Sequence, residues 1–492
     1  MQGSQKRNKI IMITIVIIVG LVIASLISYF AVIFYKFLST PLEGVTIYKN
    51  IIYLEDFESN GFEGSGTDSD PFILENEFID VDYFIGIYIG GADASITIRN
   101  CTFSNQLDNG IDIERVTGNV SIHNNTFLCS SGAIFVNEVN TISIFDNHFT
   151  KSVSVYDSNE PMIVNNIFDM NKADSFFIVG TPNASITDNR FYNCGMTILE
   201  DNITNIESWE IDDNMVNNRP ILVLRGEENS TLNGGIFGQI IGVGCKNITL
   251  KGIELEESGK AINLINSQNC SITNCIITNS LTGIGLHYGS DISIVNNTGI
   301  NCSYGIESTN AIRTIISDNT FTNCIEGIYV YGPINRDHSE ACSIINNVCE
   351  EGQIGLSIRS DYCQILYNIL RENELHGIAV SGYSNLIHHN ILIDNNPRGK
   401  SQANDNGDEN LWYDSSSMEG NLWSDWSGRG SYSVDGSAES EDIYPMSVEG
   451  GAKLLDVGEI VAISLSSVLG LGAIVFGIYF GLKKRKENKL KG

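Results

Sequence analysis

A short phrase returns along this chain at a nearly constant interval. In "DNTFTNCIEGIYVYG" (residues 318–332) an Asn is followed by an apolar residue two places on, and later by Gly-Ile. Most recurrences of the Asn position lie 21 to 25 residues apart, and one longer step of 38 residues precedes Gly252. Self-similarity at such a period predicts a solenoid, in which each unit buries its apolar face against the next unit. The equivalent positions are Cys101, Asn125, Asn147, Asn166, Asn189, Asn214, Gly252, Cys275, Asn297, Asn319, Asn347, Asn368 and Asn390.

Each unit has the residue pattern of strands rather than helices. Apolar and polar residues alternate over short runs such as "SITIRN" and "GIYVY", which are rich in Ile, Val, Thr and Phe. Units of about 22 residues, with three short strands and three bends, wind into a parallel β-helix whose coils stack about 4.8 Å apart. We expect the recurrent Asn at a bend, in an αL or similar conformation, with its amide hydrogen-bonded to the Asn one coil above.

Two apolar segments flank the repeats. Residues 10–35 carry no charged side chain, residues 460–482 are apolar and contain Gly, and each exceeds the roughly 20 residues that cross a bilayer. Basic residues precede the first segment in "QKRNK" and follow the second in "KKRKENKLKG". Because short basic flanks stay in the cytoplasm, we expect two membrane spans, with both termini cytoplasmic and the repeats outside the cell. The first segment is longer than the apolar part of a cleaved signal peptide, which favours an uncleaved anchor.

The net charge of −30 at pH 7 argues against nucleic acid as a partner, because phosphate binding requires a basic surface. Among the 11 cysteines, Cys302 and Cys324 take the same place in neighbouring units, as do Cys342 and Cys363. Such pairs are either disulfides formed outside the cell or stacks of buried thiols, and the odd number favours thiols. Sequons that would accept glycans in a glycoprotein are Asn100, Asn119, Asn124, Asn183, Asn202, Asn229, Asn247, Asn269, Asn296 and Asn301.

At both ends of the repeats the chain resembles a known family. Residues 52–80 resemble the N-terminal segment of archaeal surface proteins with right-handed parallel β-helix repeats, through Gly64, Gly66, Thr67, Asp70, Pro71 and the following "FILEN". Residues 388–446 resemble the C-terminal cap of NosD-like β-helix proteins. The matching positions are Gln402, Ala403, Asp405, Asn406, Gly407, Asn410, Trp412, Asp414, Gly420, Asn421, Trp423, Ser424, Asp425, Asp442, Tyr444 and Pro445.

Together with the repeats, the resemblance covers residues 44–447. It implies an all-β, right-handed parallel β-helix of the pectin-lyase-like kind, with roughly 14 to 16 coils. This fold hosts lyases, hydrolases, adhesins and copper-assembly factors, so the resemblance decides no chemistry. Because the end of a solenoid must be covered, we expect Trp412, Trp423 and Trp426 to close the C-terminal end.

The sequence offers few candidates for a catalytic site. A glycoside hydrolase needs two carboxylates about 5 to 9.5 Å apart. Asp212 and Asp213 are adjacent in "EIDDN", which is also an ordinary form of the repeat phrase, and the Gly-His-Gly motif of hydrolases with this fold does not occur. The sequence therefore leans against an enzyme, with a polysaccharide lyase or glycosidase as the alternative.

Metal ligands are also sparse. Asp394, Asp405 and Asp408 offer oxygen ligands to a hard ion such as Ca²⁺, but their stretch is equally a plain acidic turn. Copper would require clustered His, Met or Cys. His388 and His389 are adjacent, and adjacent residues of a strand face opposite ways. We predict no cofactor, with Ca²⁺ as the one candidate.

One face of the repeats suggests ligand binding. In "GIYVYG" the Ile and Val are expected to point inward, which leaves Tyr329 and Tyr331 pointing outward. Equivalent outward positions in adjoining coils include His287, Glu307 and Arg359. Exposed Tyr beside such groups would form a shallow platform for sugar rings, although a solvated face without function would show the same pattern.

These features lead to one principal hypothesis. The chain is expected to be a membrane-anchored extracellular β-helix protein with a binding or structural role at the cell surface, in adhesion, envelope organisation or glycan recognition, with a polysaccharide or surface glycoprotein as partner. A membrane-tethered polysaccharide lyase or glycoside hydrolase is the alternative. The expected divisions are residues 1–9 (cytoplasmic), 10–35 (membrane helix), 44–80 (N-terminal cap), 81–397 (β-helix), 398–447 (C-terminal cap), 448–459 (linker), 460–482 (membrane helix) and 483–492 (cytoplasmic tail).

Overall fold

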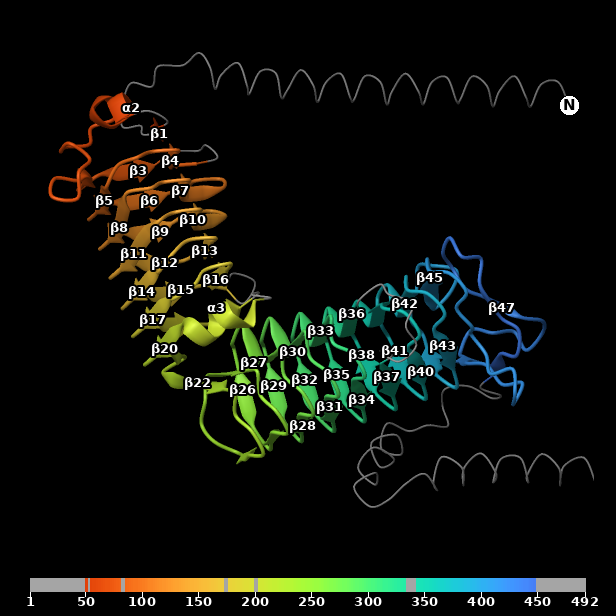
Figure 1. The fold of residues 1–492 in the computed structure, drawn as a ribbon. Coiled ribbons are helices and arrows are strands. Elements are labelled where there is room, and N and C mark those ends of the chain that lie inside the picture. The colour runs from red at the N-terminus through yellow and green to blue at the C-terminus, as the bar shows by residue number, and fades with distance from the viewer. Residues whose placement is uncertain are drawn as a thin grey trace, which may run out of the picture. The chain divides into compact units, whose positions relative to one another are not determined.

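The structure is a computed structural model that describes residues 49–51, 54–80, 85–171, 176–198, 202–332 and 342–447. Across these residues the chain winds as a parallel β-helix, as expected (Figure 1). The two expected membrane segments, with the linker and the terminal tails, lie outside the described residues. In the ranges that are described, no helix combines the length and the apolar character needed to cross a bilayer.

Three parallel sheets form the N-terminal segment, and each coil adds one strand to each of them. We name them A1, B1 and C1 in the order in which the chain visits them. A1 consists of β1 (Lys49–Ile51), β4 (Ile87–Gly90), β7 (Asn109–Glu114), β10 (Gly132–Asn137), β13 (Ser152–Tyr156), β16 (Phe176–Val179) and β19 (Met196–Ile198). B1 consists of β2 (Phe72–Glu75), β5 (Ile96–Arg99), β8 (Asn119–His123), β11 (Thr141–Phe145), β14 (Met162–Val164), β17 (Ser185–Thr187) and β20 (Glu210–Asp212). C1 consists of β3 (Phe78–Asp80), β6 (Thr102–Ser104), β9 (Thr126–Leu128), β12 (His148–Phe149), β15 (Ile167–Asp169), β18 (Arg190–Tyr192) and β21 (Met215–Val216).

The C-terminal segment repeats this order with sheets A2, B2 and C2. A2 consists of β22 (Arg219–Arg225), β24 (Gln239–Val243), β27 (Lys260–Ile265), β30 (Thr282–His287), β33 (Tyr304–Thr309), β36 (Glu326–Tyr331), β39 (Ile354–Arg359), β42 (His376–Val380) and β45 (Ala403–Asp405). B2 consists of β23 (Thr231–Asn233), β25 (Thr249–Lys251), β28 (Ser271–Thr273), β31 (Ser293–Val295), β34 (Ile315–Ser317), β37 (Ser343–Ile345), β40 (Gln364–Leu366) and β43 (Leu386–His388). C2 consists of β26 (Glu254–Glu256), β29 (Ile276–Thr278), β32 (Thr298–Ile300), β35 (Thr320–Thr322), β38 (Val348–Glu350), β41 (Ile369–Arg371), β44 (Ile391–Ile393), β46 (Leu422–Trp423) and β49 (Met446–Ser447). Outside the coils stand α2 (Leu54–Ser59), α3 (Ile203–Ser208) and the pair β47 (Tyr432–Ser433) and β48 (Glu441–Asp442).

Strand alternation decides which side chains form the core. Ile284, Ile306 and Ile328 are register partners in successive strands of A2, and each is at most 1% exposed. In C1 the inward position is an aromatic stack, where the rings of Phe103 and Phe127 have centroids 4.7 Å apart and lie nearly parallel. The in-register coils therefore stack apolar residues in columns, and burial of these columns supplies the main stabilising free energy.

A buried asparagine ladder runs through the bend before sheets C1 and C2. Asn319 accepts two hydrogen bonds at Oδ1, from the backbone N of Asn297 at 2.9 Å and from its Nδ2 at 3.0 Å. Its own Nδ2 donates to Oδ1 of Asn347 at 2.9 Å and to the carbonyl oxygen of Ile294 at 2.9 Å. Each ladder amide is thus fully bonded inside the protein, as the sequence predicted.

The backbone conformation at this bend differs from the expectation in one respect. The residue with positive φ stands directly before the ladder Asn, as at Asp318 (φ 58°) before Asn319 and Asn296 (φ 57°) before Asn297. Asn and Asp tolerate the left-handed region, and their side chains there point away from the core. The sequon residue Asn296 is therefore exposed, while its neighbour Asn297 is buried.

The chain reverses between the two segments at Asn217 and Asn218. Both have positive φ, 50° and 61°, which fits a two-residue type I′ hairpin turn. The turn pairs β21 with β22 antiparallel, so that sheets C1 and A2 form one continuous 16-stranded sheet. The long interval before Gly252 therefore contains this reversal, followed by the first coil of the second segment.

The core changes to the other face of this continuous sheet at the reversal. Val216, buried in the first core, pairs with Arg219, whereas Leu222 and Leu224 pack against the second core. Residues 219 and 222 lie on opposite faces because strand side chains alternate. The hand of a coil depends on its strand direction, on the side of the sheet that faces the core and on the direction in which the coils stack. At this turn the strand direction reverses and the stacking direction continues. The hand therefore stays the same only because the core also moves to the other side of the sheet. Both segments therefore have the same hand.

The last coil of the N-terminal segment covers the outer face of A2 beside the reversal. Gln239 is fully buried and donates from Nε2 to the carbonyl oxygens of Met196 at 2.7 Å and Lys260 at 2.8 Å. The backbone N of Met196 donates in return to Oε1 of Gln239 at 3.0 Å. Gln239 thus covers the edge of A1 at β19 from the outer face of A2.

Two tryptophans close the C-terminal end, as expected from the sequence. Trp412 and Trp423 are 1% and 0% exposed, and their indole Nε1 atoms donate to the buried carboxylates of Asp405 and Asp442 at 2.8 and 2.9 Å. Trp426 is partly buried against the same core. All eleven cysteines are buried in the described residues with reduced thiols, which agrees with the second of the two alternatives.

We predict that Asn319→Ala destabilises the protein by about 3 kcal/mol or more, because it removes four hydrogen bonds and leaves buried partners unsatisfied. Urea unfolding followed by circular dichroism measures this change. Asn323→Ala is the matched control, since Asn323 is exposed and donates a single side-chain bond to Asn301. Equal effects of the two substitutions would contradict a dominant role of the buried ladder.

Candidate functional site

The five expected platform residues lie on one outer face of A2. Glu307 is the register partner of Tyr329, and His287, Tyr331 and Arg359 belong to the column beside them, in strands β30, β36 and β39. The intervening residues of each strand point into the core, so these side chains share the outward face. We call this surface the A2 face.

Aromatic and cationic groups contact one another at its centre. The rings of Tyr329 and Tyr304 have centroids 5.6 Å apart, and the guanidinium carbon of Arg359 lies 5.6 Å from the centroid of the Tyr329 ring. Burial raises the pKa of Tyr329, so that its hydroxyl remains a donor at neutral pH. Tyr304 was not among the expected residues because it lies two places before the buried Ile306, and regular strand alternation would place it on the core side.

The carboxylate of Glu307 is bonded to neighbouring side chains of the A2 face and does not extend into solvent. Its Oε2 lies 3.0 Å from Nζ of Lys260 and accepts from Oγ1 of Thr282 at 2.9 Å. The Lys260 and Glu307 side chains are only 7% and 20% exposed. Breaking such a buried pair leaves an uncompensated charge, so the pair holds three successive strands together. Glu326, on the same face, has a buried Oε2 without a hydrogen-bond partner, and burial raises its pKa.

The three aspartates considered for Ca²⁺ have different surroundings. Asp405 is fully buried and accepts from the backbone N of Gly407, Nδ2 of Asn410, Nε1 of Trp412 and Oγ of Ser440. Its oxygens are thus occupied in holding the C-terminal cap. Asp394 and Asp408 are exposed. Within the described ranges no three His, Cys, Asp or Glu side chains converge as metal ligands.

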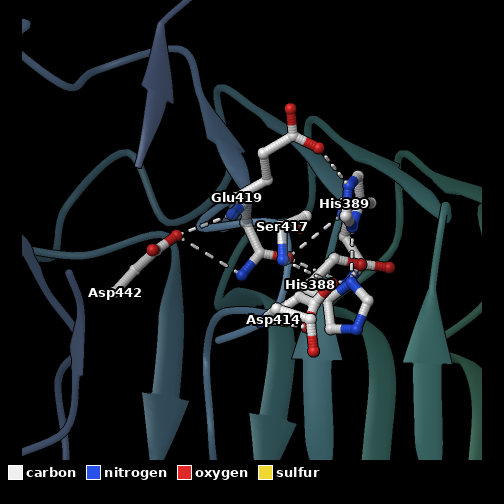
Figure 2. A network of polar contacts seen from close by, with 9 residues as sticks. His388, His389, Asp414, Ser417, Glu419 and Asp442 are labelled. Atoms are coloured by element: carbon white, nitrogen blue, oxygen red, sulfur yellow. Dashed lines mark hydrogen bonds and ion pairs between the residues drawn. The ribbon is translucent and has the colours of Figure 1, made fainter. Parts of the chain in front are cut away.

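The adjacent histidines do converge, against the expectation from strand alternation. Their Nδ1 atoms lie within hydrogen-bond distance, and Nε2 of His389 lies 3.0 Å from Oε2 of Glu419 (Figure 2). His389 has φ 60°, so the chain leaves the strand there and its ring turns back toward His388. Burial, and then the neighbouring His389, lower the pKa of His388, so it is a neutral imidazole at neutral pH.

The outer face of A1 carries a carboxyl group that the sequence search missed. Asp112 is only 7% exposed, its register partners on either side are Tyr88 and Phe135, and its Oδ1 has no hydrogen-bond partner. Burial raises the pKa of Asp112 to about 7. Glu114 lies two residues further on the same strand, and hence on the same face. The sequence "DIE" could have indicated two carboxyl groups on one face, because residues two apart on a strand point to the same side. Adjacent acids such as Asp212 and Asp213 would point to opposite sides.

We predict that Asp112→Asn stabilises the protein at alkaline pH. The unfolded chain loses this proton near pH 3.8 and the folded chain near pH 7, so stability falls as the pH rises between these values. At about 1.4 kcal/mol per pKa unit the loss approaches about 4 kcal/mol above pH 7. Urea unfolding should therefore show a more stable variant at pH 8 and no difference at pH 4. Equal stability at pH 8 would refute the raised pKa.

Two family models match this chain, one on either side of a boundary close to the reversal. Residues 60–208 match the family model described as "Right handed beta helix region", and residues 213–428 match the one described as "Periplasmic copper-binding protein (NosD)". No curated protein gives a significant match to the sequence.

Solved structures that resemble the chain include the periplasmic alginate epimerase AlgG, with 10% identity, a TM-score of 0.28 and coverage of 77% of this chain and 83% of that one. The Dettilon tailspike protein gp208 resembles it with 14% identity, a TM-score of 0.22 and coverage of 72% and 62%. Likenesses at these TM-scores carry no argument about function. Residues 213–428 are thus similar to the NosD family and residues 60–208 to right-handed β-helix proteins, and the observed coils are of the parallel β-helix kind.

Proposed function

We propose that this protein is an extracellular, membrane-anchored β-helix protein that binds a polysaccharide on its A2 face. The observation that carries the proposal is the group of Tyr304, Tyr329, Tyr331 and Arg359 on adjacent strands of one sheet. Tyrosine rings give large, rigid contact areas with a polar end, which suits the apolar faces and hydroxyls of sugar rings.

The charges on this face favour a neutral polysaccharide. Lys260 is paired with Glu307, which leaves Arg359 as the cation that a ligand would meet among the residues discussed above. The chain as a whole carries −30, so a polyanion would be repelled over most of the surface. A flat face with mixed hydrogen-bonding groups and exposed rings therefore supports binding of uncharged sugars.

Location outside the cytoplasm is supported by two independent features. The family matched by residues 213–428 is described as periplasmic. The apolar segments 10–35 and 460–482 with their basic flanks suit two membrane spans that leave the β-helix on the outer side. Adhesion or envelope organisation would then follow from binding a cell-surface glycan.

The family description also names copper, but the described residues do not fit a copper site. Copper requires several converging His, Cys or Met ligands. The Nδ1 atoms of His388 and His389 face each other directly, and Nε2 of His389 is engaged by Glu419. The cysteines are buried within the coils, so neither set offers an accessible cluster.

We predict that the double substitution of Tyr329 and Tyr331 by Ala weakens polysaccharide binding about tenfold or more, since each lost ring contact costs about 0.5–1.5 kcal/mol. Binding of the full-length protein in detergent to a glycan array, followed by titration with the best ligand, measures the effect. Tyr367→Ala is the matched control, because Tyr367 is 42% exposed, much like Tyr331 at 39%, and lies outside the A2 face. Unchanged binding by the double variant would exclude this face as the site.

A further inference from the structure

Two adjoining hollows follow the bend between sheets A1 and B1. Their volumes are about 440 Å³ and about 480 Å³, within the range of small-ligand pockets. They adjoin at the consecutive residues Arg115 and Val116, and we call them together the A1–B1 trough. The larger is lined by Tyr88, Gly90, Gly91 and Arg115, and the other by Val116, Thr117, Glu138, Val139, Asn140, Asp157 and Asn159.

The walls of the trough result from the backbone conformation of the bend. One residue of each coil has a positive φ there, 55° at Arg115, 55° at Glu138 and 43° at Asp157. The next residue of the coil is buried, and the residue after it is exposed again. The bend therefore presents two outward rows of polar side chains. One row consists of Arg115, Glu138 and Asp157, and the other of Thr117, Asn140 and Asn159.

The amide groups of the second row are available to a ligand. The exposed side chains of Asn140 and Asn159 have no hydrogen-bond partner in the part of the chain that the structure describes. At another bend of the same coils the exposed Asn165 donates from Nδ2 to Oδ1 of Asp146 at 2.6 Å. Stacked polar groups of successive coils thus bond one another there, whereas the two amides of the trough do not.

An aromatic ring stands at one end of the trough. A Cβ atom at Gly90 would come within 2.7 Å of the Tyr88 hydroxyl, so the tyrosine side chain lies across Gly90. A Cβ atom at Gly91 would meet nothing within 4 Å, so the trough is open at this point. A sugar ring that enters there can pack its apolar side against Tyr88 and keep its hydroxyls directed to the walls.

The backbone of the trough is already hydrogen-bonded from coil to coil. The backbone N of Asn140 donates to the carbonyl oxygen of Val116 at 3.0 Å, and that of Asn159 to the carbonyl oxygen of Val139 at 3.2 Å. Extended peptides commonly bind a sheet through main-chain hydrogen bonds, which these groups cannot supply. The trough offers side-chain groups instead, and these suit the hydroxyls of a sugar.

The charges of the trough favour an uncharged ligand. Glu138 and Asp157 lie in adjacent coils, and Arg115 is the one cation among the lining residues. Together with the net charge of −30 this repels a polyanion. No three potential metal ligands converge within the described ranges. Carboxylates accept hydrogen bonds and amides both donate and accept them, so the walls can bond sugar hydroxyls of either role.

We propose that the A1–B1 trough binds an uncharged polysaccharide along the axis of the β-helix, as a second site separate from the A2 face. The proposal goes beyond the role of the A2 face and does not depend on it. The lining residues come from four successive coils, which span roughly 14 Å at the usual strand spacing. This length accommodates several linked sugars, so the trough recognises a segment of a chain rather than a single sugar.

The test titrates soluble β-glucan, xylan and mannan into the full-length protein in detergent and follows binding by calorimetry. The parent protein carries Tyr329→Ala and Tyr331→Ala, so that the A2 face does not contribute. Adding Asn140→Ala and Asn159→Ala should weaken binding of at least one polymer about tenfold, because two hydrogen bonds to the ligand are lost. A tetrasaccharide of that polymer should compete for the site, and its monosaccharide should not.

The matched control adds Asn165→Ala and Asn274→Ala to the same parent. Both residues are exposed amides at bends outside the trough and the A2 face, so binding should stay as in the parent. Thermal unfolding should give the same midpoint for the trough variant and its parent, because Asn140 and Asn159 are exposed and unbonded. Polylysine serves as the alternative ligand, a basic chain that the carboxylates of Glu138 and Asp157 would attract.

The outcomes separate this site from the A2 face. If the parent binds as tightly as the unchanged protein and the trough variant does not, the trough is the site and the A2 face is not. The trough proposal is wrong if the parent binds none of the three polymers, or if the trough variant binds them as tightly as the parent. It is also wrong if the control loses as much affinity, or if polylysine alone is bound.

Discussion

Stacking of identical positions from one coil to the next is the interaction on which this structure depends. A strand of three residues is too short to be stable alone, but the strands inside each sheet are paired on both sides. The Asn ladder adds side-chain hydrogen bonds in the same direction, in a bend that would otherwise bury unsatisfied carbonyl groups. The functional surfaces discussed above are outer faces and bends of sheets held in this way.

The reversal at Asn217 and Asn218 sets the arrangement of those surfaces. Because the core changes to the other face of the continuous sheet, the outer face of A2 meets the last strand of A1 where Gln239 is bonded to Met196. The A2 face offers tyrosines and a cation, whereas the outer face of A1 carries the buried carboxyl group of Asp112.

The candidate sites were predictable only where the alternation of a strand is regular. Tyr329, Tyr331 and Arg359 could be assigned to one face because the Ile and Val between them are clearly core residues. Tyr304 could not, since regular alternation from the buried Ile306 would place it on the core side. The convergence of His388 and His389 depends on the positive φ of His389, which ends the strand alternation that had placed the two rings on opposite faces.

The sequence by itself determined the class of fold, the period of the coils, the Asn ladder and the tryptophan cap. Each of these features can be recognised within a short stretch of sequence, either in one repeat or at the end of the repeats. Tertiary structure alone decided which carboxyl groups are buried and which are bonded. The burial of Asp112 and the pairing of Glu307 with Lys260 depend on neighbours more than 20 residues away, and one donor to Asp405, Ser440, lies 35 residues further along the chain. A residue's charge and accessibility are set by such neighbours through desolvation and hydrogen bonding, and no local pattern records them.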